Sequence, residues 1–330
     1  MADYGVPPNP PYVKLFYADV RNQMQSLWML FASFMFAVMG VCVKLASEEF
    51  STSEMVMYRG IVGVIVLAVI IRAQGGSFRT TMPMAHFWRC LIGVISLWLW
   101  YYSIGSLPLA TAMTLNYLSP IWIAVWLFAI GWWHAKNQVQ WPLLVAVAMS
   151  FVGVVLLLQP AFHANQLVPA LIALFSSVLT AMAYMQVRKL GLAGEPENRV
   201  VFYFAVMNIV AGVAGNYLFA GDKPAVWHPI NTVHGALLLL GIGVCATSAQ
   251  IAMTRAYRLG QTLVVANLQY TGIVFSSIWG VLVFGDVFSW HSWAGIAIIL
   301  ASGVAATFYN TRNTERGKAI ANTDPIASEV

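Results

Sequence analysis

Charged residues are scarce in this chain of 330 residues. Asp, Glu, Lys and Arg make up 9% of the sequence, whereas hydrophobic residues make up 60%. A soluble domain carries about 25% charged residues, so this composition excludes an ordinary soluble globular protein. The sequence also lacks the alternating segments of about ten residues that a transmembrane β-barrel shows. We therefore expect an all-α integral membrane protein.

Cysteine is rare too, and the motifs of hydrolytic enzymes are missing. The three cysteines, Cys42, Cys90 and Cys245, fall inside apolar stretches, so they form no disulfide framework and no CxxC metal motif. No HExxH and no GxSxG motif occurs. The segment Phe284–Asp286 resembles part of an intramembrane aspartyl-protease motif, but Val283 replaces its glycine and no second intramembrane aspartate is present. We expect no cofactor and no metal, and an intramembrane enzyme is the weaker alternative.

Acidic residues are fewer than basic ones, and the net charge is +5. This surplus does not require a nucleic-acid partner, because the basic residues lie at the ends of apolar stretches. With the N-terminus inside, only Lys44, Arg59 and Lys223 fall toward the outer side, which agrees with the positive-inside rule. The charge pattern therefore predicts both termini in the cytoplasm.

Ten apolar stretches are long enough to cross a bilayer, for which about 20 residues suffice. We expect an N-terminal cytoplasmic segment over 1–24, which lacks the apolar core of a signal peptide. A polar cytoplasmic tail is expected over 311–330, and the short loops leave no room for a soluble domain. The expected spans are 25–46, 53–72, 86–104, 108–132, 141–160, 166–188, 199–220, 233–254, 262–284 and 289–309.

The two halves of the chain resemble each other at an offset of about 150 residues. AVMGVCVKLA around Lys44 is similar to AMAYMQVRKL around Arg188, and IGVISLWLWYYSIGSLPLA is similar to IGVCATSAQIAMTRAYRLGQT. Each half, 25–160 and 161–310, holds five spans, so the second half enters the membrane from the opposite side. This predicts an inverted repeat, which provides two related states that can alternate.

Two spans, 107–133 and 259–286, carry amides and hydroxyls in their middle. A helix that faces only lipid gains nothing from such groups, which are tolerated where they face protein or a wet cavity. Interrupted helices at matching places in two halves are the best sequence indication of a transporter's binding site. The main polar residues of the two interruptions are Asn116, Tyr117, Asn267 and Tyr270.

These features resemble the EamA branch of the drug/metabolite transporter superfamily. The resemblance covers residues 25 to 310. It rests on the duplicated ten-span layout, on FAVMGVCVK with its basic residue, on LPLATAMTLNYLSPIW with its mid-helix proline, and on GVLVFGD. It implies that spans 1–4 and 6–9 surround a central cavity, that spans 5 and 10 lie outside, and that the chain moves metabolites. Two positions depart from the family pattern: the fourth span ends in GWWH instead of an acid, and Gly272 stands where proline is expected.

Helical spacing places further polar residues on the faces that would line such a cavity. Interhelical hydrogen bonding, worth roughly 0.6 to 2 kcal/mol per contact, is the alternative role for each of them. The predicted substrate-binding residues are Trp100, Ser103, Asn116, Tyr117, Tyr184, Gln250, Asn267 and Tyr270.

Charged residues within the spans are candidates for function by default. Lys44, Glu54 and Arg59 lie near the outer ends of spans 1 and 2, where we expect gating or charge pairing. Either Lys44 or Arg59 would bind a substrate carboxylate, or Glu54 would form an ion pair with one of them and close the outer mouth. Arg89 is expected to extend its charge to the membrane interface. The six histidines are expected in loops or at span ends, mostly solvated.

The sequence thus predicts a multi-pass secondary transporter of the cell inner membrane. It would move a small polar or zwitterionic metabolite, with an amino acid or derivative favoured, by alternating access in efflux or exchange. No acid lies at the midplane of a span, which disfavours proton coupling. A proton-coupled drug/metabolite antiporter or an uptake carrier is nevertheless the alternative. The expected partners are the small-molecule substrate and the lipid bilayer, without nucleic acid, and a homodimer is left open.

Overall fold

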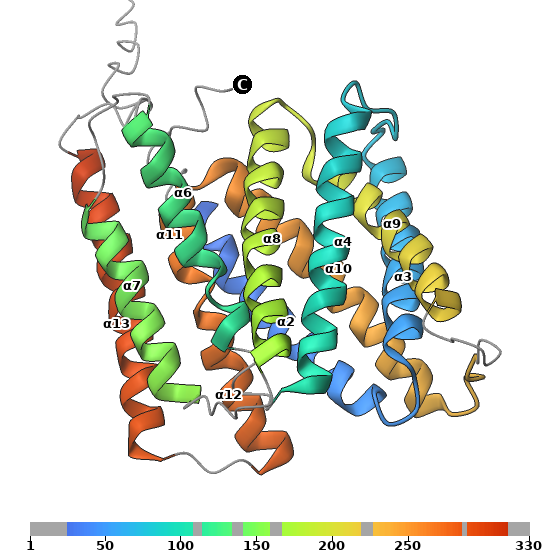
Figure 1. The fold of residues 1–330 in the computed structure, drawn as a ribbon. Helices are drawn as coiled ribbons and strands as arrows, with labels where there is room; N and C mark the ends of the chain where they lie inside the picture. Colours follow the sequence, from blue (N-terminus) through green and yellow to red (C-terminus); the bar gives the residue numbers. More distant parts are fainter. Residues whose placement is uncertain are drawn as a thin grey trace, which may run out of the picture.

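The computed structural model describes residues 25–107, 114–133, 141–158, 167–218, 227–285 and 289–315. Within these ranges the regular structure is entirely helical, and the helices stand side by side in one bundle (Figure 1). This confirms the all-helical prediction. The helices are α2 (Trp28–Ala46), α3 (Thr52–Ala73), α4 (Pro83–Ser106), α6 (Ser119–Trp133), α7 (Trp141–Leu158), α8 (Leu167–Leu192), α9 (Glu197–Leu218), α10 (Val233–Leu259), α11 (Thr262–Leu268), α12 (Thr271–Phe284) and α13 (Trp290–Glu315).

Among the described residues, six segments are long and apolar enough to cross a membrane. They are α2, α3, α8, α9, α10 and the consecutive pair α11 and α12. Shorter apolar helices cover Trp141–Leu157 and Trp290–Ala306. The helix α13 continues to Glu315, a few residues into the segment expected to be a tail.

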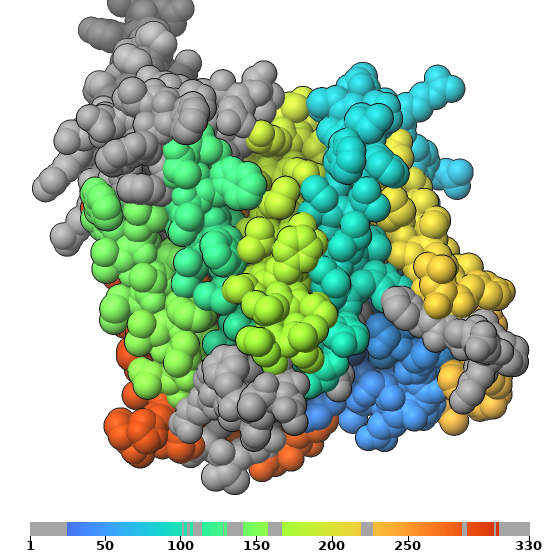
Figure 2. Space-filling model, viewed as in Figure 1, coloured from blue at the N-terminus to red at the C-terminus, as the bar shows by residue number. Residues whose placement is uncertain are grey.

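The middle of the face drawn in Figure 2 is formed by α4, α6, α7 and α8, which lie next to one another. Each of these helices exposes large apolar side chains, among them Ile95, Trp126, Val145 and Phe175. An apolar surface this extensive would be a liability in water, but it is the surface that lipid tails require. The exposed side chains of these four helices therefore fit a membrane environment.

Local sequence signals fix the ends of several helices. At the start of α3, Ser51 and Glu54 form a capping box, in which the Glu54 N–H donates to Ser51 Oγ and the Ser51 N–H donates to Glu54 Oε2. At the start of α10, Thr232 Oγ1 accepts from the Gly235 N–H at 2.9 Å. The helix α12 ends at Gly285, whose φ of 71° is left-handed and favours glycine.

Four helix pairs pack most extensively: α3 with α9, α2 with α10, α7 with α13, and α4 with α8. The closest approach in the α3–α9 pair occurs at two glycines. A methyl group on Gly60 would lie 2.7 Å from the carbonyl oxygen of Ala205, and one on Gly212 would lie 2.7 Å from that of Ser53. Glycine is therefore required for the backbones to come this near.

Candidate functional site

The two predicted helix interruptions lie close together inside the bundle. In one span, α11 ends at Leu268 and α12 begins at Thr271, so that Gln269 and Tyr270 form a turn. In the other, residues 114–116 are helical and α6 begins after a turn at 117–118. The rings of Tyr117 and Tyr270 are 6.2 Å apart between centroids. The breaks predicted in the two halves therefore face each other.

Further aromatic residues extend this contact. Tyr184 of α8 and Tyr257 of α10 are stacked, with ring centroids 5.4 Å apart and an interplanar angle of 26°. Gln269 connects them, since its amide Nε2 donates to the Tyr184 hydroxyl at 3.4 Å and its Oε1 accepts from the Tyr257 hydroxyl at 3.3 Å. We call Tyr117, Tyr184, Tyr257, Gln269 and Tyr270 the tyrosine cluster.

Several buried polar atoms at or near this level lack a hydrogen-bond partner within the described part of the chain. They include the Tyr270 hydroxyl, Gln250 Oε1 and Thr254 Oγ1, the last two from α10. A buried polar atom left without a partner costs about 1–3 kcal/mol. Such atoms are the places where a polar ligand or water gains most by binding. Of the residues predicted to bind substrate, Gln250 and Tyr270 carry such an atom.

Asn267, which was also predicted to bind substrate, is used differently. Its Oδ1 accepts from the Ser150 hydroxyl of α7 at 2.6 Å, and its Nδ2 donates to the Ser302 carbonyl of α13 at 3.2 Å. The side chain is 1% exposed. Its amide therefore joins three helices, and it points toward α7 and α13 instead of the tyrosine cluster.

The remaining predicted residues lie on or near α4 and α6. Ser103 is completely buried, and its hydroxyl donates to the Leu99 carbonyl within the same helix at 2.8 Å. Trp100 and Asn116 are partly exposed. The structure does not bring Ser103 into the tyrosine cluster.

The expected ion pair of Glu54 with Lys44 or Arg59 is wrong. Glu54 is completely buried, and its carboxylate is bound by His228, from the segment before α10. The His228 backbone N–H donates to Glu54 Oε1 at 2.5 Å, and His228 Nδ1 lies 2.9 Å from Oε2. The capping box holds the carboxylate at the start of α3, where a neighbouring segment reaches it more easily than Arg59, five positions along the same helix.

The two basic residues of that predicted group lie on separate aromatic rings. Lys44 is exposed, and its Nζ lies 3.8 Å from the centroid of Phe284. Arg59 is 7% exposed and lies 6.0 Å from the centroid of Phe204. Lys44, Glu54 and Arg59 thus form no single cluster. Asp286, the acid at the end of the ninth span, lies outside the described residues.

Arg89 does not extend to the membrane interface as expected. Its side chain is 2% exposed, and the guanidinium carbon lies 3.8 Å from the centroid of the same Phe204 ring. The aromatic face of α9 holds the charge inside the bundle, so Arg89 is not an interfacial residue. Spacing on α4 alone did not reveal this buried position.

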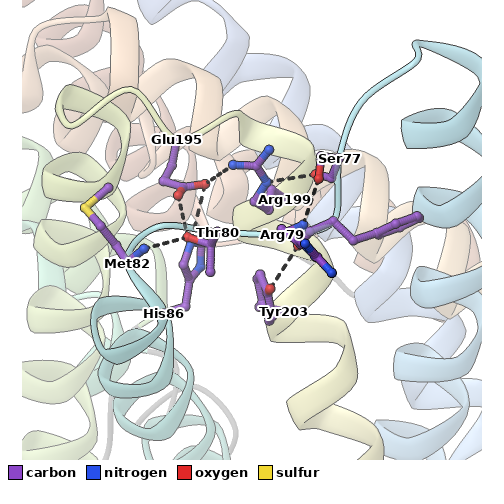
Figure 3. A network of polar contacts seen from close by, with 9 residues as sticks. Ser77, Arg79, Thr80, Met82, His86, Glu195, Arg199 and Tyr203 are labelled. Atoms are coloured by element: carbon purple, nitrogen blue, oxygen red, sulfur yellow. Dashed lines mark hydrogen bonds and ion pairs between the residues drawn. The ribbon is translucent and has the colours of Figure 1, made fainter.

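A second polar cluster, which we call the Glu195 cluster, ties two connections together (Figure 3). Glu195 lies between α8 and α9 and is 3% exposed. Its carboxylate accepts from Thr80 Oγ1 at 2.5 Å and from Arg199 Nη1 at 2.9 Å, and it lies 3.5 Å from His86 Nε2. Tyr203 adds a hydrogen bond to the Phe78 carbonyl. The connection before α4 is thereby fastened to the connection before α9.

Burial by itself would raise the pKa of Glu195. The hydrogen bonds from Thr80 and Arg199 outweigh burial and hold the pKa of this carboxyl below its usual value. Glu195 is therefore ionised at neutral pH. His86, expected to be solvated, is 2% exposed and belongs to this cluster.

Among the described residues, no group of three or more His, Cys, Asp and Glu side chains is placed to hold a metal ion. The chemistry that the site offers is therefore that of hydroxyls, amides, aromatic faces and guanidinium groups. Such groups bind and orient a small polar molecule, and they contain no activated nucleophile.

Residues 23–159 match the EamA-like transporter family. The chain is 30% identical over 279 residues to a pseudopaline exporter of Pseudomonas aeruginosa, which covers 83% of this chain and 92% of that protein. It is 27% identical over 306 residues to a riboflavin transporter of Vibrio cholerae, and this match covers 90% of this chain and 97% of that protein. A solved crystal structure matches with a TM-score of 0.74 at 17% identity, covering 87% of this chain and 99% of the other, which establishes likeness of fold alone.

Proposed function

Because the chain belongs to the EamA-like transporter family of the drug/metabolite transporter superfamily, we propose that it is a secondary transporter working by alternating access. It is a membrane transporter and not an enzyme, as the family and the names of its relatives indicate. We propose that it moves a small polar or zwitterionic metabolite, an amino acid or derivative in the first instance, across the cytoplasmic membrane by efflux or exchange.

The proposed architecture is ten spans in two inverted repeats, 25–160 and 161–310, with both termini cytoplasmic. The contacts of α3 with α9 support it. A methyl group on Gly60 would meet Ala205 and Ile209, and one on Gly212 would meet Ser53 and Met57. These residues correspond at one constant offset of about 150 positions. The corresponding pairs are Ser53 with Ala205, Met57 with Ile209, and Gly60 with Gly212.

The contact of α7 with α13 has the same reciprocity. A methyl group on Gly153 would meet Gly295 and Ile299, whereas one on Gly295 would meet Gly153 and Leu157. Again one constant offset relates Gly153 to Gly295 and Leu157 to Ile299. A pair of helices that contact each other through the same positions in both directions is what a two-fold axis between the halves produces.

The other two major helix pairs support the same symmetry. If α2 corresponds to α8 and α4 to α10, the pair α2–α10 becomes α8–α4 when the halves are exchanged. Both pairs are among the four that pack most extensively. All four major helix pairs are therefore consistent with one pseudo-two-fold relation.

The single observation that carries the functional proposal is the meeting of the two helix breaks at Tyr117 and Tyr270. Each break comes from one half, so a substrate bound between them contacts both halves at once. The phenol rings offer flat apolar faces, and the hydroxyls and Gln250 offer hydrogen bonds. This combination suits a small molecule with an aromatic or aliphatic body and polar groups.

Flux measurements on purified protein in liposomes test the proposal. The assay uses labelled amino acids, nucleosides and aromatic metabolites, with and without a pH gradient. Tyr270→Phe should lower a saturable flux, because it removes a hydroxyl from the proposed site. The matched control is Tyr102→Phe, which removes a hydroxyl from an exposed tyrosine of α4 that is 53% exposed.

Saturable flux that falls in Tyr270→Phe and persists in Tyr102→Phe is the expected result. Equal flux in both variants would place the binding site elsewhere. Absence of saturable flux across the panel would argue against a carrier for these metabolites. Flux that follows the pH gradient would replace the uncoupled carrier by a proton-coupled antiporter, with the buried carboxylate of Glu54 the first residue to test.

A further inference from the structure

Two arginines from different helices meet on one aromatic ring. Arg89 of α4 lies 3.8 Å and Arg59 of α3 lies 6.0 Å from the centroid of Phe204, on α9. The helices α3 and α4 follow each other in the chain and run in opposite directions (Figure 1). Each arginine lies about two turns from the start of its helix, so the two side chains reach the ring from opposite ends of the bundle.

The guanidinium of Arg89 is unusual in what surrounds it. Its Nε and Nη1 atoms are buried and have no hydrogen-bond partner in the part of the chain that the structure describes. The ring of Phe204 offers a cation–π contact, which compensates only part of the free energy lost on removing a charge from water. The remaining loss is recovered if acceptor atoms and a negative charge approach the guanidinium.

No carboxylate within the described ranges supplies that charge. The carboxylates there contact other partners: Glu195 contacts His86 and Arg199, Glu54 contacts His228, and Glu197 contacts Arg258. The charged or titratable neighbours of Arg89 include Arg59, His86, Cys90 and Tyr184. A second cation nearby makes the surroundings of Arg89 more positive still, so the local field favours an anion.

Tyr184 lies between the two arginines and the proposed transport site. It lies within electrostatic range of both Arg89 and Arg59, and it stacks on Tyr257 in the tyrosine cluster. Its side chain remains partly exposed although Ala181 and Arg188, on the same face of α8, are buried. Tyr184 is therefore within reach of both the tyrosine cluster and the two arginines.

We propose that the transported substrate carries a carboxylate that pairs with Arg89. Arg59 contributes a second positive charge, Phe204 fixes the plane of the Arg89 guanidinium, and the tyrosine cluster holds the body of the substrate. A carboxylate matches the planar guanidinium and, as a monoanion, is easier to dehydrate than a phosphate dianion. This inference rests on the proposed transport function and names the substrate class for the same site.

The test uses amino acids and aromatic acids, each paired with its primary amide, and phenyl phosphate as a separate arm. Flux into liposomes is measured for the wild-type protein, Arg89→Met, Arg89→Lys and the control Arg79→Met, which changes an exposed arginine before α4. We expect wild-type flux of the transported acid to exceed that of its amide at least tenfold. Arg89→Met should reduce acid flux at least tenfold, Arg89→Lys should retain part of it, and Arg79→Met should leave it unchanged.

A measurement without substrate separates a binding role from a structural one. Removing an uncompensated buried charge should raise the melting temperature of Arg89→Met above that of the wild type, whereas loss of a structural residue would lower it. The inference is overturned if amides are transported as well as acids, or if Arg89→Met transports acids normally. Preference for phenyl phosphate over the acids would overturn the carboxylate assignment. If the wild-type protein transports none of these substrates, the transport proposal itself is refuted.

Discussion

Replacing Gly60 by alanine tests one of the tight helix contacts at the proposed symmetry axis. The added methyl group would lie 2.7 Å from the Ala205 carbonyl oxygen, and 2.8 Å from both the backbone nitrogen and Cγ1 of Ile209. Two of these three atoms belong to the backbone of α9 and cannot rotate away. Either the helices separate locally or the methyl group is compressed, and overpacking of this kind costs about 1–3 kcal/mol.

The substitution also has a favourable effect, because alanine is a better helix former than glycine by about 1 kcal/mol. Gly40→Ala isolates that effect. Gly40 lies within α2, and a methyl group there would have no atom within 4 Å. The difference in unfolding free energy between Gly40→Ala and Gly60→Ala should therefore equal the steric cost of about 1–3 kcal/mol, with Gly60→Ala the less stable.

The assay is reversible unfolding of the purified protein in mixed micelles with increasing denaturing detergent, followed by the helical circular-dichroism signal. Gly212→Ala, on the opposite side of the same contact, should lose about as much stability as Gly60→Ala, because the contacts are reciprocal. The reasoning fails if Gly60→Ala is as stable as Gly40→Ala. A large difference between Gly60→Ala and Gly212→Ala would count against the reciprocity of the two halves.

Three further changes give distinct results. Tyr270→Phe should leave the unfolding free energy unchanged or slightly increased, measured in the same micelles, because the hydroxyl that it removes has no partner within the described chain. Asn267→Ala should lower that free energy by about 1–3 kcal/mol, because the amide bonds two other helices. Glu195→Gln should destabilise the protein at neutral pH, because Thr80 and Arg199 would then donate to a neutral amide instead of a charged carboxylate. Folding lowers the pKa of Glu195, so its carboxylate stabilises the folded protein. This stabilisation is complete at pH values above the usual pKa of a glutamate, and it is lost as the pH falls through the pKa of Glu195 in the folded state. The difference in unfolding free energy between the wild type and Glu195→Gln should then be constant from pH 6 to 8 and should shrink only at acidic pH. A change in this difference near neutral pH would contradict the assignment.

The helix breaks were predictable because their signal is local. Amides and hydroxyls in the middle of an apolar stretch indicate an interior position, and Tyr117 and Tyr270 indeed lie against each other. The direction of Asn267 was not predictable by the same means. Helical spacing placed Asn267 and Tyr270 on one face, but the turn at Gln269 and Tyr270 interrupts the helical phase between them. The two side chains consequently point to different neighbours.

Arg89 and Glu195 were missed for a different reason. Each role depends on a contact between segments far apart in the chain: Arg89 meets Phe204 on α9, and Glu195 meets Thr80, from which it is separated by 115 positions. Spacing within a helix describes faces but does not say which faces meet. The burial of Arg89 could have been suspected only from knowing that α4 lies against α9.

The distribution of tight and loose contacts suggests where the molecule moves. At the α3–α9 and α7–α13 contacts, one helix from each proposed half meets the other with almost no space between backbones. The tyrosine cluster is held more weakly, since both hydrogen bonds of Gln269 exceed 3.2 Å and the Tyr117 and Tyr270 rings are 6.2 Å apart. Close-packed glycine contacts resist sliding, whereas a helix bends most readily where its backbone hydrogen bonds are already interrupted. In the proposed alternating-access cycle, opening to alternate sides is therefore expected to bend the two broken spans around these two fixed helix pairs, and the proposed substrate site is at the bend.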